Sequence, residues 1–431
     1  MNAKNALVCL GGGPSPVINA SLQGVVERCF AHGDKIQEVY CAHHGIEGVL
    51  LEELIDMRAE DPAELARLRD TPSSGAIGTC RYKLGEGREA DFTRILEVLR
   101  AHEIGYFFYI GGNDSMDTAD KVSRLAQEAG MELVAVGVPK TIDNDLGDEA
   151  RTIIDHTPGY GSTARYWANL IADAEEENRG MCVSECVSVY QAMGRCAGFI
   201  AAASRLGDPN RQLPLQIYMA ECGHTLESLA ENVNRQLRES GRCIVVVNEG
   251  FDVGDIGAAV DGFGHIEYGA SKLSACQGVT NYLNSVKLSA RGYANSQVPG
   301  VLQRSTGMNR SPVDVQEAYE VGAHAAELAA QGKSGFMATI LREPGADYKV
   351  RYDAVPLRTV ANSERFMPKD WIADNRIDVT DAFLNYAKPL IGAESAPVVY
   401  ENGLIRFARL RRQLIDKKCP VYIPVGMRQR A

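Results

Sequence analysis

The sequence alternates short apolar runs with glycine-rich or polar loops, and this alternation limits the possible folds more than any other feature. The first third of the chain contains three such units. They are residues 6–10 before Gly11-Gly12-Gly13, residues 106–110 before Gly111-Gly112-Asn113-Asp114-Ser115, and residues 133–138 before Pro139-Lys140-Thr141-Ile142-Asp143-Asn144-Asp145. The first two loops lead into segments with apolar residues at helical spacing. Repeated strand, loop and helix predicts an α/β fold with a mostly parallel sheet and helices on both faces.

The second half of the chain repeats this organisation. Residues 182–192 form an apolar run that ends in Met193-Gly194-Arg195, and residues 243–248 form another that ends in Glu249-Gly250. We predict two α/β/α lobes: an N-terminal lobe over residues 1–155, and a C-terminal lobe with a C-terminal extension over residues 156–431. A return of the chain to the first lobe after about residue 305 is left open. Ligands of such sheets bind at the carboxyl ends of the strands, where all these loops fall.

The composition argues against several classes of protein. Lys and Arg number 45 and Asp and Glu 56, a net charge of −11, so we expect neither nucleic acid nor a membrane as a partner. No run approaches the roughly 18 consecutive apolar residues of a membrane span, and the N-terminus has no apolar stretch of signal-peptide length. The eleven cysteines include no Cys-x-x-Cys pair. This pattern is typical of a cytoplasmic protein with reduced thiols.

The two glycine-rich loops are candidates for binding phosphate and metal. Glycines such as Gly12 and Gly13 let backbone amides approach a phosphate, and the N-terminus of the following helix favours negative charge. The amide oxygen of Asn113 and the carboxylate of Asp114 are suitable ligands for Mg²⁺. The structural alternatives are a tight turn for the glycines and a helix cap for Asp114.

The segment 140–145 places a lysine and two aspartates directly after an apolar run. If the segment is extended, Asp143 and Asp145 point to the same side. A carboxylate beside a lysine and phosphates can accept a hydroxyl proton while the cation offsets developing charge. A solvated turn uses the same residue types, but the apolar run before the segment favours a functional role.

Three arginines follow apolar or glycine-rich runs: Arg81, Arg195 and Arg304. The guanidinium group binds phosphate through two parallel hydrogen bonds. A single arginine more often forms a surface ion pair, but an arginine at the end of a strand-like run is a better candidate for a phosphate site.

Taken together, the motifs resemble those of the phosphofructokinase family, in the family's order, over about residues 5–330. They are Gly11-Gly12, Ser74-Gly75, Gly78-Thr79-Cys80-Arg81, Gly111-Gly112-Asn113-Asp114-Ser115, Pro139-Lys140-Thr141-Ile142-Asp143-Asn144-Asp145, Met193-Gly194-Arg195, Asn248-Glu249-Gly250 and Gln303-Arg304-Ser305. The resemblance implies two α/β lobes with the active site in the cleft between them. It also implies reversible phosphoryl transfer to the 1-hydroxyl of fructose 6-phosphate in glycolysis, assisted by Mg²⁺.

The resemblance also implies a role for each site residue. Asp143 would take the hydroxyl proton, with Lys140, Thr141 and Arg195 as further catalytic residues. The sugar phosphate would be held by Thr141, Ile142, Asp143, Met193, Gly194, Arg195, Glu249, Gln303 and Arg304. The phosphoryl donor would face Gly12, Gly13, Arg81, Asp114 and Lys140. Asn113 and Asp114 would hold the metal, although Asn113 stands where the family usually has an aspartate.

Two positions bear on the identity of the donor. Asp114 stands where ATP-using members typically have a glycine, and Lys140 where they have a small residue. Both differences resemble the pyrophosphate-dependent branch of the family. A carboxylate at position 114 fills and charges the space that an ATP α-phosphate needs, and a lysine at position 140 adds a cation beside the transferred group. We therefore expect pyrophosphate as the donor.

Other functions remain as alternatives. An ATP-dependent sugar-phosphate kinase would tolerate Asp114 and Lys140, and a non-catalytic regulatory subunit would lack catalytic residues that are present here. A NAD kinase-like enzyme shares a glycine loop but not the Met-Gly-Arg motif. The resemblance implies a homodimer or homotetramer, and another acceptor such as sedoheptulose 7-phosphate stays open.

Overall fold

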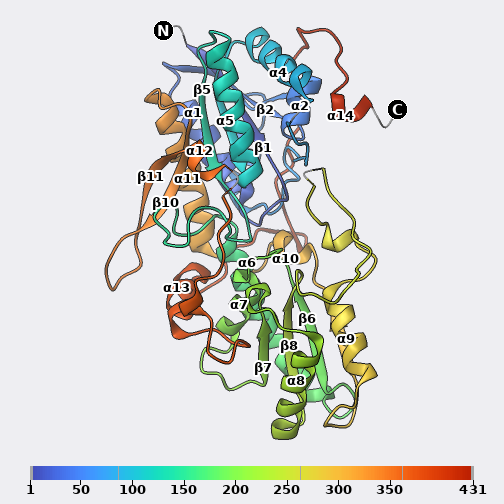
Figure 1. Cartoon of the computed structure of the whole chain (residues 1–431). Coiled ribbons are helices and arrows are strands. Elements are labelled where there is room, and N and C mark those ends of the chain that lie inside the picture. The colour runs from blue at the N-terminus through green and yellow to red at the C-terminus, as the bar shows by residue number, and fades with distance from the viewer. Residues whose placement is uncertain (1–2, 86, 263, 362, 429–431) are drawn as a thin grey trace.

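The computed structural model describes residues 3–85, 87–262, 264–361 and 363–428 and has two lobes, each built around its own sheet (Figure 1). One lobe holds a seven-stranded sheet and the other a four-stranded sheet. Both lobes cover their sheets with helices on two faces, so the predicted α/β architecture with mostly parallel sheets is confirmed.

The seven-stranded sheet has the order β11-β10-β5-β4-β1-β2-β3. Strands β2, β1, β4, β5 and β10 are parallel, and β3 and β11 close the two edges in antiparallel pairing. Apolar residues on both faces make these strands nearly continuous hydrophobic runs, as a sheet covered on both sides requires. The strands are β1 Lys4–Leu10, β2 Ile36–Ala42, β3 Leu54–Asp56, β4 Ile104–Gly111, β5 Val134–Pro139, β10 Phe336–Arg342 and β11 Val350–Pro356.

Helices α1 and α11 cover one face of this sheet, and α2, α4, α5 and α12 cover the other. The first pair packs unusually closely, because a Cβ atom at Gly24 would lie 2.0 Å from the carbonyl oxygen of Tyr319, and one at Gly322 would lie 2.2 Å from that of Ser21. The helices are α1 Ile18–Ala31, α2 Ile46–Leu51, α3 Pro62–Ala66, α4 Glu89–Ala101, α5 Asn113–Glu128, α11 Pro312–Ala330 and α12 Leu357–Val360.

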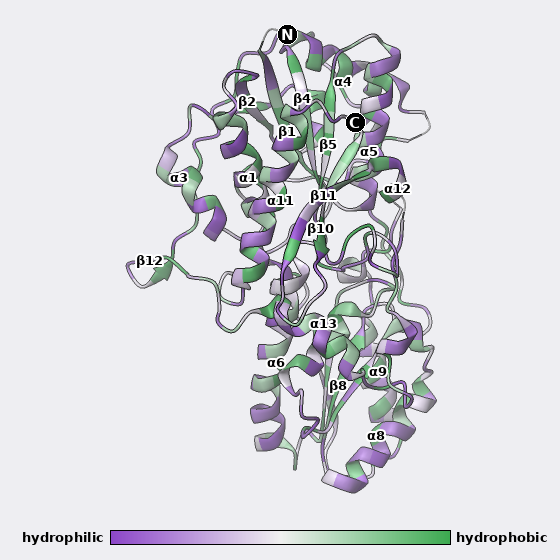
Figure 2. Ribbon diagram, turned by 90° about the vertical axis from the view of Figure 1, so that its left-hand side faces the viewer, coloured by the Kyte–Doolittle hydropathy of each residue, from purple (hydrophilic) through white to green (hydrophobic). Residues whose placement is uncertain are grey.

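The four-stranded sheet has the order β7-β8-β6-β9 and is parallel throughout. Helices α6 and α7 pack on one face, with α13 against α6, and α8 and α9 pack on the other. In Figure 2 the strand β8 is coloured toward the hydrophobic end of the scale, while α8 carries many hydrophilic residues. The elements are α6 Tyr160–Met181, β6 Val187–Ala192, α7 Phe199–Ala202, β7 Leu215–Tyr218, α8 Leu226–Ser240, β8 Cys243–Asn248, α9 Ala275–Ser285, β9 Ala294–Gln297, α10 Leu302–Ser305 and α13 Asp381–Ile391.

The chain after residue 305 does not stay in one lobe. Strands β10 and β11 lie in the seven-stranded sheet, whereas α13 packs on α6 of the other lobe. The predicted C-terminal lobe of residues 156–431 therefore includes two strands of the first lobe. The physical reason is that β10 is an apolar strand that pairs in parallel with β5 and covers its otherwise open edge.

Residues 400–428 form a strap along the first lobe, attached through buried carboxylates. Glu60 accepts the backbone N–H groups of Arg411 and Arg412 at 2.7 and 2.6 Å, and Glu52 accepts that of Lys418 at 2.6 Å. The strap contains β12 Tyr400–Glu401, β13 Leu404–Ile405 and α14 Val425–Arg428. Across the residues described, no helix has the length and apolar character that a membrane crossing requires.

Candidate active site

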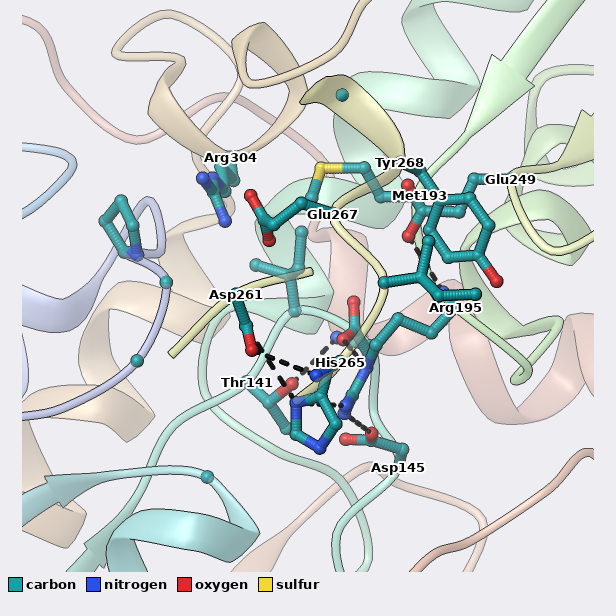
Figure 3. Close-up of a pocket in the computed structure, with 18 of the residues that line it drawn as sticks. Thr141, Asp145, Met193, Arg195, Glu249, Asp261, His265, Glu267, Tyr268 and Arg304 are labelled. Atoms are coloured by element: carbon teal, nitrogen blue, oxygen red, sulfur yellow. Dashed lines mark hydrogen bonds and ion pairs between the residues drawn. The ribbon is translucent and has the colours of Figure 1, made fainter. Parts of the chain in front are cut away.

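A cavity of about 830 Å³ lies between the two lobes, at the carboxyl ends of β1, β4 and β5 from one side and of β6 and β8 from the other (Figure 3). Its wall includes nearly every site residue expected from the sequence. They are Gly12, Gly13, Arg81, Asn113, Asp114, Lys140, Thr141, Ile142, Asp143, Met193, Arg195, Glu249, Gln303 and Arg304. Gly194 does not line the cavity; its backbone N–H donates to Glu249 Oε1 at 3.1 Å, behind the wall.

Three cationic side chains converge on the loop after β1. The ammonium of Lys140 donates to the carbonyl oxygen of Gly13 at 2.6 Å. A Cβ atom at Gly13 would lie 2.4 Å from Arg304 Nη1 and 3.6 Å from Arg81 Nη2, and one at Gly12 would lie 3.6 Å from Lys140 Nζ. Positive groups from three separate chain segments thus surround two glycines, which is an arrangement that a multiply charged phosphate can use.

The electrostatics of this cluster favour an added anion. Burial, together with the charges of Arg304 and Arg81, lowers the pKa of Lys140 to about 7 against the opposing effect of Asp143. Burial, followed by the charge of Arg81, also lowers the pKa of Arg304. The Nε atom of Arg304 is buried and has no hydrogen-bond partner among the described residues. Close cations with an unused donor are costly unless a negative ligand joins them.

Asp143 and Asp145 both reach Arg195. Asp145 Oδ2 lies 2.7 Å from Arg195 Nη2, and Asp143 Oδ2 lies 3.5 Å from Arg195 Nε. The segment is not extended as supposed from the sequence, because Asn144 adopts a φ of 57°. The buried Asn144 side chain fixes this bend by accepting the N–H of Thr157 at 3.1 Å. The bend still leaves the two carboxylates on a shared guanidinium.

The surroundings make Asp143 a weaker acid than a solvated aspartate. Burial, followed by the charge of Asp145, raises the pKa of Asp143 to about 6, while Arg195, Arg304 and Lys140 act in the opposite direction. The backbone N–H of Asp143 donates to Thr141 Oγ1 at 3.1 Å, which fixes the start of the turn. A buried carboxylate with a pKa near neutrality suits a group that takes up and releases a proton.

Two buried side chains of the second lobe, Glu249 and Gln303, hold neighbouring parts of the cavity wall in place. Glu249 Oε1 accepts the backbone N–H of Arg195 at 2.9 Å, and burial raises the pKa of Glu249 to about 7. The Gln303 amide is already occupied: its oxygen accepts from Trp167 Nε1 at 2.8 Å, and its nitrogen donates to the carbonyl of Gly300 at 2.9 Å. The main role of the Gln303 side chain is therefore to hold the loop that carries Arg304, because its amide groups are already engaged.

The predicted metal ligands lie at the start of α5. The side-chain nitrogen of Asn113 donates to the carbonyl oxygen of Ser363, and Asp114 Oδ2 lies 3.9 Å from His265 Nε2. In the parts of the chain that the structure covers, no three His, Cys, Asp or Glu side chains are grouped as a metal site. The residues fit a Mg²⁺ ion that keeps much of its coordination for waters and phosphate oxygens, as this ion commonly does.

One wall of the cavity comes from a segment that the sequence analysis did not use. The connection between β8 and α9 places Asp261, His265, Glu267 and Tyr268 in the cavity (Figure 3). Arg81 forms ion pairs with Asp261 at 3.0 Å and with Glu267. The available signal was the position of this polar segment after a buried strand, where the ligand-binding loops of α/β sheets lie.

Comparisons with known proteins agree with this geometry. Residues 5–329 match the family model described as phosphofructokinase. The chain is 39% identical to a pyrophosphate--fructose 6-phosphate 1-phosphotransferase from Halomonas elongata, with 98% of this chain and all of the relative covered. A protein of the same name from Methylococcus capsulatus is 39% identical over 97% of this chain and 98% of its own.

A solved structure gives the same result for the fold. The crystal structure of a pyrophosphate-dependent phosphofructokinase from Marinobacter aquaeolei superposes with a TM-score of 0.86 at 37% identity. The match covers 97% of this chain and 99% of the solved one, so it includes both lobes.

Proposed function

The chain belongs to the phosphofructokinase family, and we propose that it transfers a phosphoryl group from pyrophosphate to the 1-hydroxyl of fructose 6-phosphate. The products are fructose 1,6-bisphosphate and inorganic phosphate, and the proposal includes the reverse reaction, with fructose 1,6-bisphosphate as the phosphoryl donor. Two relatives that match along almost the whole chain carry the name of this activity. The same activity places the enzyme in glycolysis.

The position of Lys140 is the observation that carries the proposal. Its ammonium is buried, touches the carbonyl of Gly13, and shares that loop with Arg81 and Arg304. A diphosphate placed there meets three cations and restores the charged form of Lys140, because a nearby negative charge raises the pKa of an amine. Positive charge at the transferred group also stabilises the transition state.

Asp143 is the proposed general base. In the forward reaction the sugar oxygen forms a bond to the terminal phosphorus of the donor, and the bond from that phosphorus to the bridging oxygen breaks. The hydroxyl proton passes to the Asp143 carboxylate, and the bridging oxygen leaves as part of inorganic phosphate. Arg195 holds the base through its Nε, 3.5 Å from Asp143 Oδ2, and remains bound to Asp145 at 2.7 Å.

The remaining residues divide between acceptor and donor. Thr141, Ile142, Met193 and Glu249 form the acceptor side with Asp143 and Arg195, and Gly194 and Gln303 support them from behind. Arg304 serves both sides, because it belongs to the acceptor set and also reaches the donor loop at Gly13. Gly12, Gly13, Arg81, Asp114 and Lys140 form the donor side. The carboxylate of Asp114 lies at the first turn of α5, where it adds negative charge against the α-phosphate of a nucleotide.

Asp114 and the amide oxygen of Asn113 would hold Mg²⁺ together with oxygens of the donor. When bound, the ion would neutralise donor charge. Because Asn113 is uncharged, more of the affinity for the ion would come from the donor itself. The proposal further includes a cytoplasmic homodimer or homotetramer.

A coupled assay with purified protein, fructose 6-phosphate and Mg²⁺ tests the proposal, with pyrophosphate or ATP as the only donor. We expect turnover with pyrophosphate. Turnover with ATP alone would overturn the donor assignment but keep the fold and the acceptor chemistry. Turnover only after fructose 6-phosphate is replaced by sedoheptulose 7-phosphate would overturn the acceptor.

Variants of the two donor-choice positions sharpen this test. The double variant Asp114→Gly, Lys140→Gly should lose pyrophosphate activity. The ratio of its rate with ATP to its rate with pyrophosphate should rise. The double variant Asp120→Gly, Lys121→Gly, on the outer side of α5, controls for the effect of glycine on helix stability. Equal pyrophosphate activity in the two double variants would contradict the roles of Asp114 and Lys140.

A further inference from the structure

The connection between β8 and α9 folds into a small hairpin, and we call its described residues 260–262 and 264–267 the hairpin tip. Val260 and Ile266 form an antiparallel bridge. The backbone N–H of Asp261 donates to the carbonyl of His265 at 2.9 Å, and that of His265 donates to Asp261 Oδ1 at 3.0 Å. A further bond joins Glu267 N–H to the carbonyl of Ala259 at 2.8 Å. These internal bonds give the tip a defined shape of its own.

The hairpin tip starts in the second lobe and ends against the first. The backbone of the tip approaches the first lobe at Gly262, where a Cβ atom would lie 2.1 Å from the carbonyl oxygen of Arg81. On the same side, Asp261 Oδ2 lies 3.0 Å from Arg81 Nη1, and Glu267 pairs with the same guanidinium. His265 extends the contact to Asp114, at 3.9 Å. The tip thus touches two of the expected donor-binding residues directly.

The two carboxylates on Arg81 differ in burial. The Asp261 side chain is 7% exposed, whereas that of Glu267 is 37% exposed. Asp261 is also fixed by its bond to the N–H of His265. The more exposed carboxylate is the easier of the two to displace, because exposed ion pairs contribute little stability.

We infer that the hairpin tip is a further determinant of donor choice, with Glu267 occupying Arg81 until the donor arrives. Pyrophosphate takes the place of the Glu267 carboxylate on Arg81, while Asp261 stays and acts as a positioning residue for the guanidinium. The backbone contact at Gly262 closes this side of the cavity against donors longer than a diphosphate. This inference rests on the proposed function, since it concerns the same donor site.

The inference explains why Arg81 can be both a donor ligand and an ion-pair partner. The terminal phosphate of pyrophosphate carries more charge than one carboxylate and accepts two hydrogen bonds from a guanidinium. Exchange of one anion for the other keeps Arg81 neutralised throughout. A longer donor gains the same contact only if the tip moves away from the Arg81 backbone, and the internal bonds of the hairpin oppose such a change.

The test compares kinetics of Glu267→Gln and Gly262→Ala with pyrophosphate, inorganic tripolyphosphate and ATP as donors. Glu267→Gln removes the competitor for Arg81, so KM for pyrophosphate should fall about 3-fold, the size expected for a partly exposed ion pair. KM for fructose 6-phosphate should stay unchanged. Glu239→Gln, on the exposed face of α8, is the matched control.

Gly262→Ala moves the tip away from the Arg81 backbone. The ratio of the rate with tripolyphosphate to the rate with pyrophosphate should therefore rise about 10-fold, which corresponds to the free energy of one good contact. Gly180→Ala, in α6, is the control because a Cβ atom there meets nothing within 4 Å. If Gly262→Ala does not fold, calorimetric binding of methylenediphosphonate to wild type and Glu267→Gln still tests the exchange on Arg81, with tighter binding expected in the variant.

The outcomes separate this inference from the proposed function. If the wild type uses pyrophosphate but the KM for pyrophosphate in Glu267→Gln is unchanged or raised, only the exchange of anions on Arg81 is overturned. An unchanged donor ratio in Gly262→Ala would overturn the closing role of the tip. Wild type that uses only ATP would overturn the proposed donor, and the closed pocket with it.

Discussion

Replacing Lys140 with methionine should make the empty protein more stable while removing its use of pyrophosphate. Methionine has a similar length and no charge, so the substitution removes the buried ammonium with little change in packing. Lys140 is 4% exposed and shares its surroundings with Arg304 and Arg81. A gain in stability that accompanies loss of activity is the expected sign of a residue placed for ligand binding.

The size of the effect follows from the pKa of Lys140, which burial lowers from 10.5 to about 7. A lowered amine pKa destabilises the fold fully below pH 7, and the penalty disappears as the pH rises toward 10.5. At 1.36 kcal/mol per pKa unit, the full penalty is on the order of 5 kcal/mol, an upper value for the gain in Lys140→Met. Chemical denaturation at pH 6 and pH 9 should therefore show a larger gain at pH 6.

Pyrophosphate binding should reverse the pKa shift of Lys140. At pH 8 the empty enzyme holds about 0.1 proton on this amine, and a bound diphosphate restores the charged form, so binding takes up close to one proton. Isothermal titration calorimetry in two buffers with different ionisation enthalpies measures this uptake. The proton equilibria of the ligand are common to wild type and Lys140→Met, so their difference isolates Lys140.

Two results would refute this account of Lys140. The first is equal proton uptake by wild type and Lys140→Met, which would mean that the amine is not neutral in the empty site. The second is a decrease in the free energy of unfolding in Lys140→Met, of the size expected when a core residue is replaced. Lys121→Met, on the outer side of α5, is the control for replacing a lysine on this lobe.

Three more predictions test other parts of the structure. Asp143→Asn should lower kcat by about 10³-fold with KM nearly unchanged, and the wild-type rate should fall below pH 6, the raised pKa of Asp143, in a pH profile. Burial alone would lower the pKa of His156, but Glu317 and Asp155 raise it to about 9. His156→Ala should therefore lower the free energy of unfolding in denaturant by roughly 3 kcal/mol. The stability that His156 gives the wild-type protein should be complete below pH 6.5 and lost as the pH rises through 9. Gly24→Ala should lower the melting temperature by several degrees, because its Cβ would meet the Tyr319 carbonyl at 2.0 Å.

The fold was predictable from the sequence because its main features are local. The apolar runs before Gly11, Gly111 and Lys140 correspond to β1, β4 and β5, and the segments after the first two loops are helical. The course of the chain after residue 305 was not fixed in this way. Which edge of which sheet β10 joins depends on partners hundreds of residues away, and no local pattern encodes such a choice.

Most of the candidate site was predictable for a related reason. Loops at the carboxyl ends of parallel strands meet at one edge, so Gly12, Asp114 and Asp143 had to lie near one another. The hairpin tip was missed because its residues lie more than ten positions beyond β8, and their placement depends on the contact between Gly262 and the Arg81 backbone. That contact joins segments from different lobes and leaves no periodic signal in the sequence.

The charges along the cavity show why the site needs more than its cations. Seven carboxylates and four Lys or Arg side chains line it, the carboxylates being Asp114, Asp143, Asp145, Glu249, Asp261, Glu267 and Glu364. Such a wall would repel two phosphate compounds if every group kept its ordinary charge. The raised pKa values of Asp143 and Glu249 already weaken the negative side, and displacement of Glu267 would weaken it further. The affinity of the site for its donor would then depend on proton uptake, a metal counter-charge and displacement of the Glu267 carboxylate acting together.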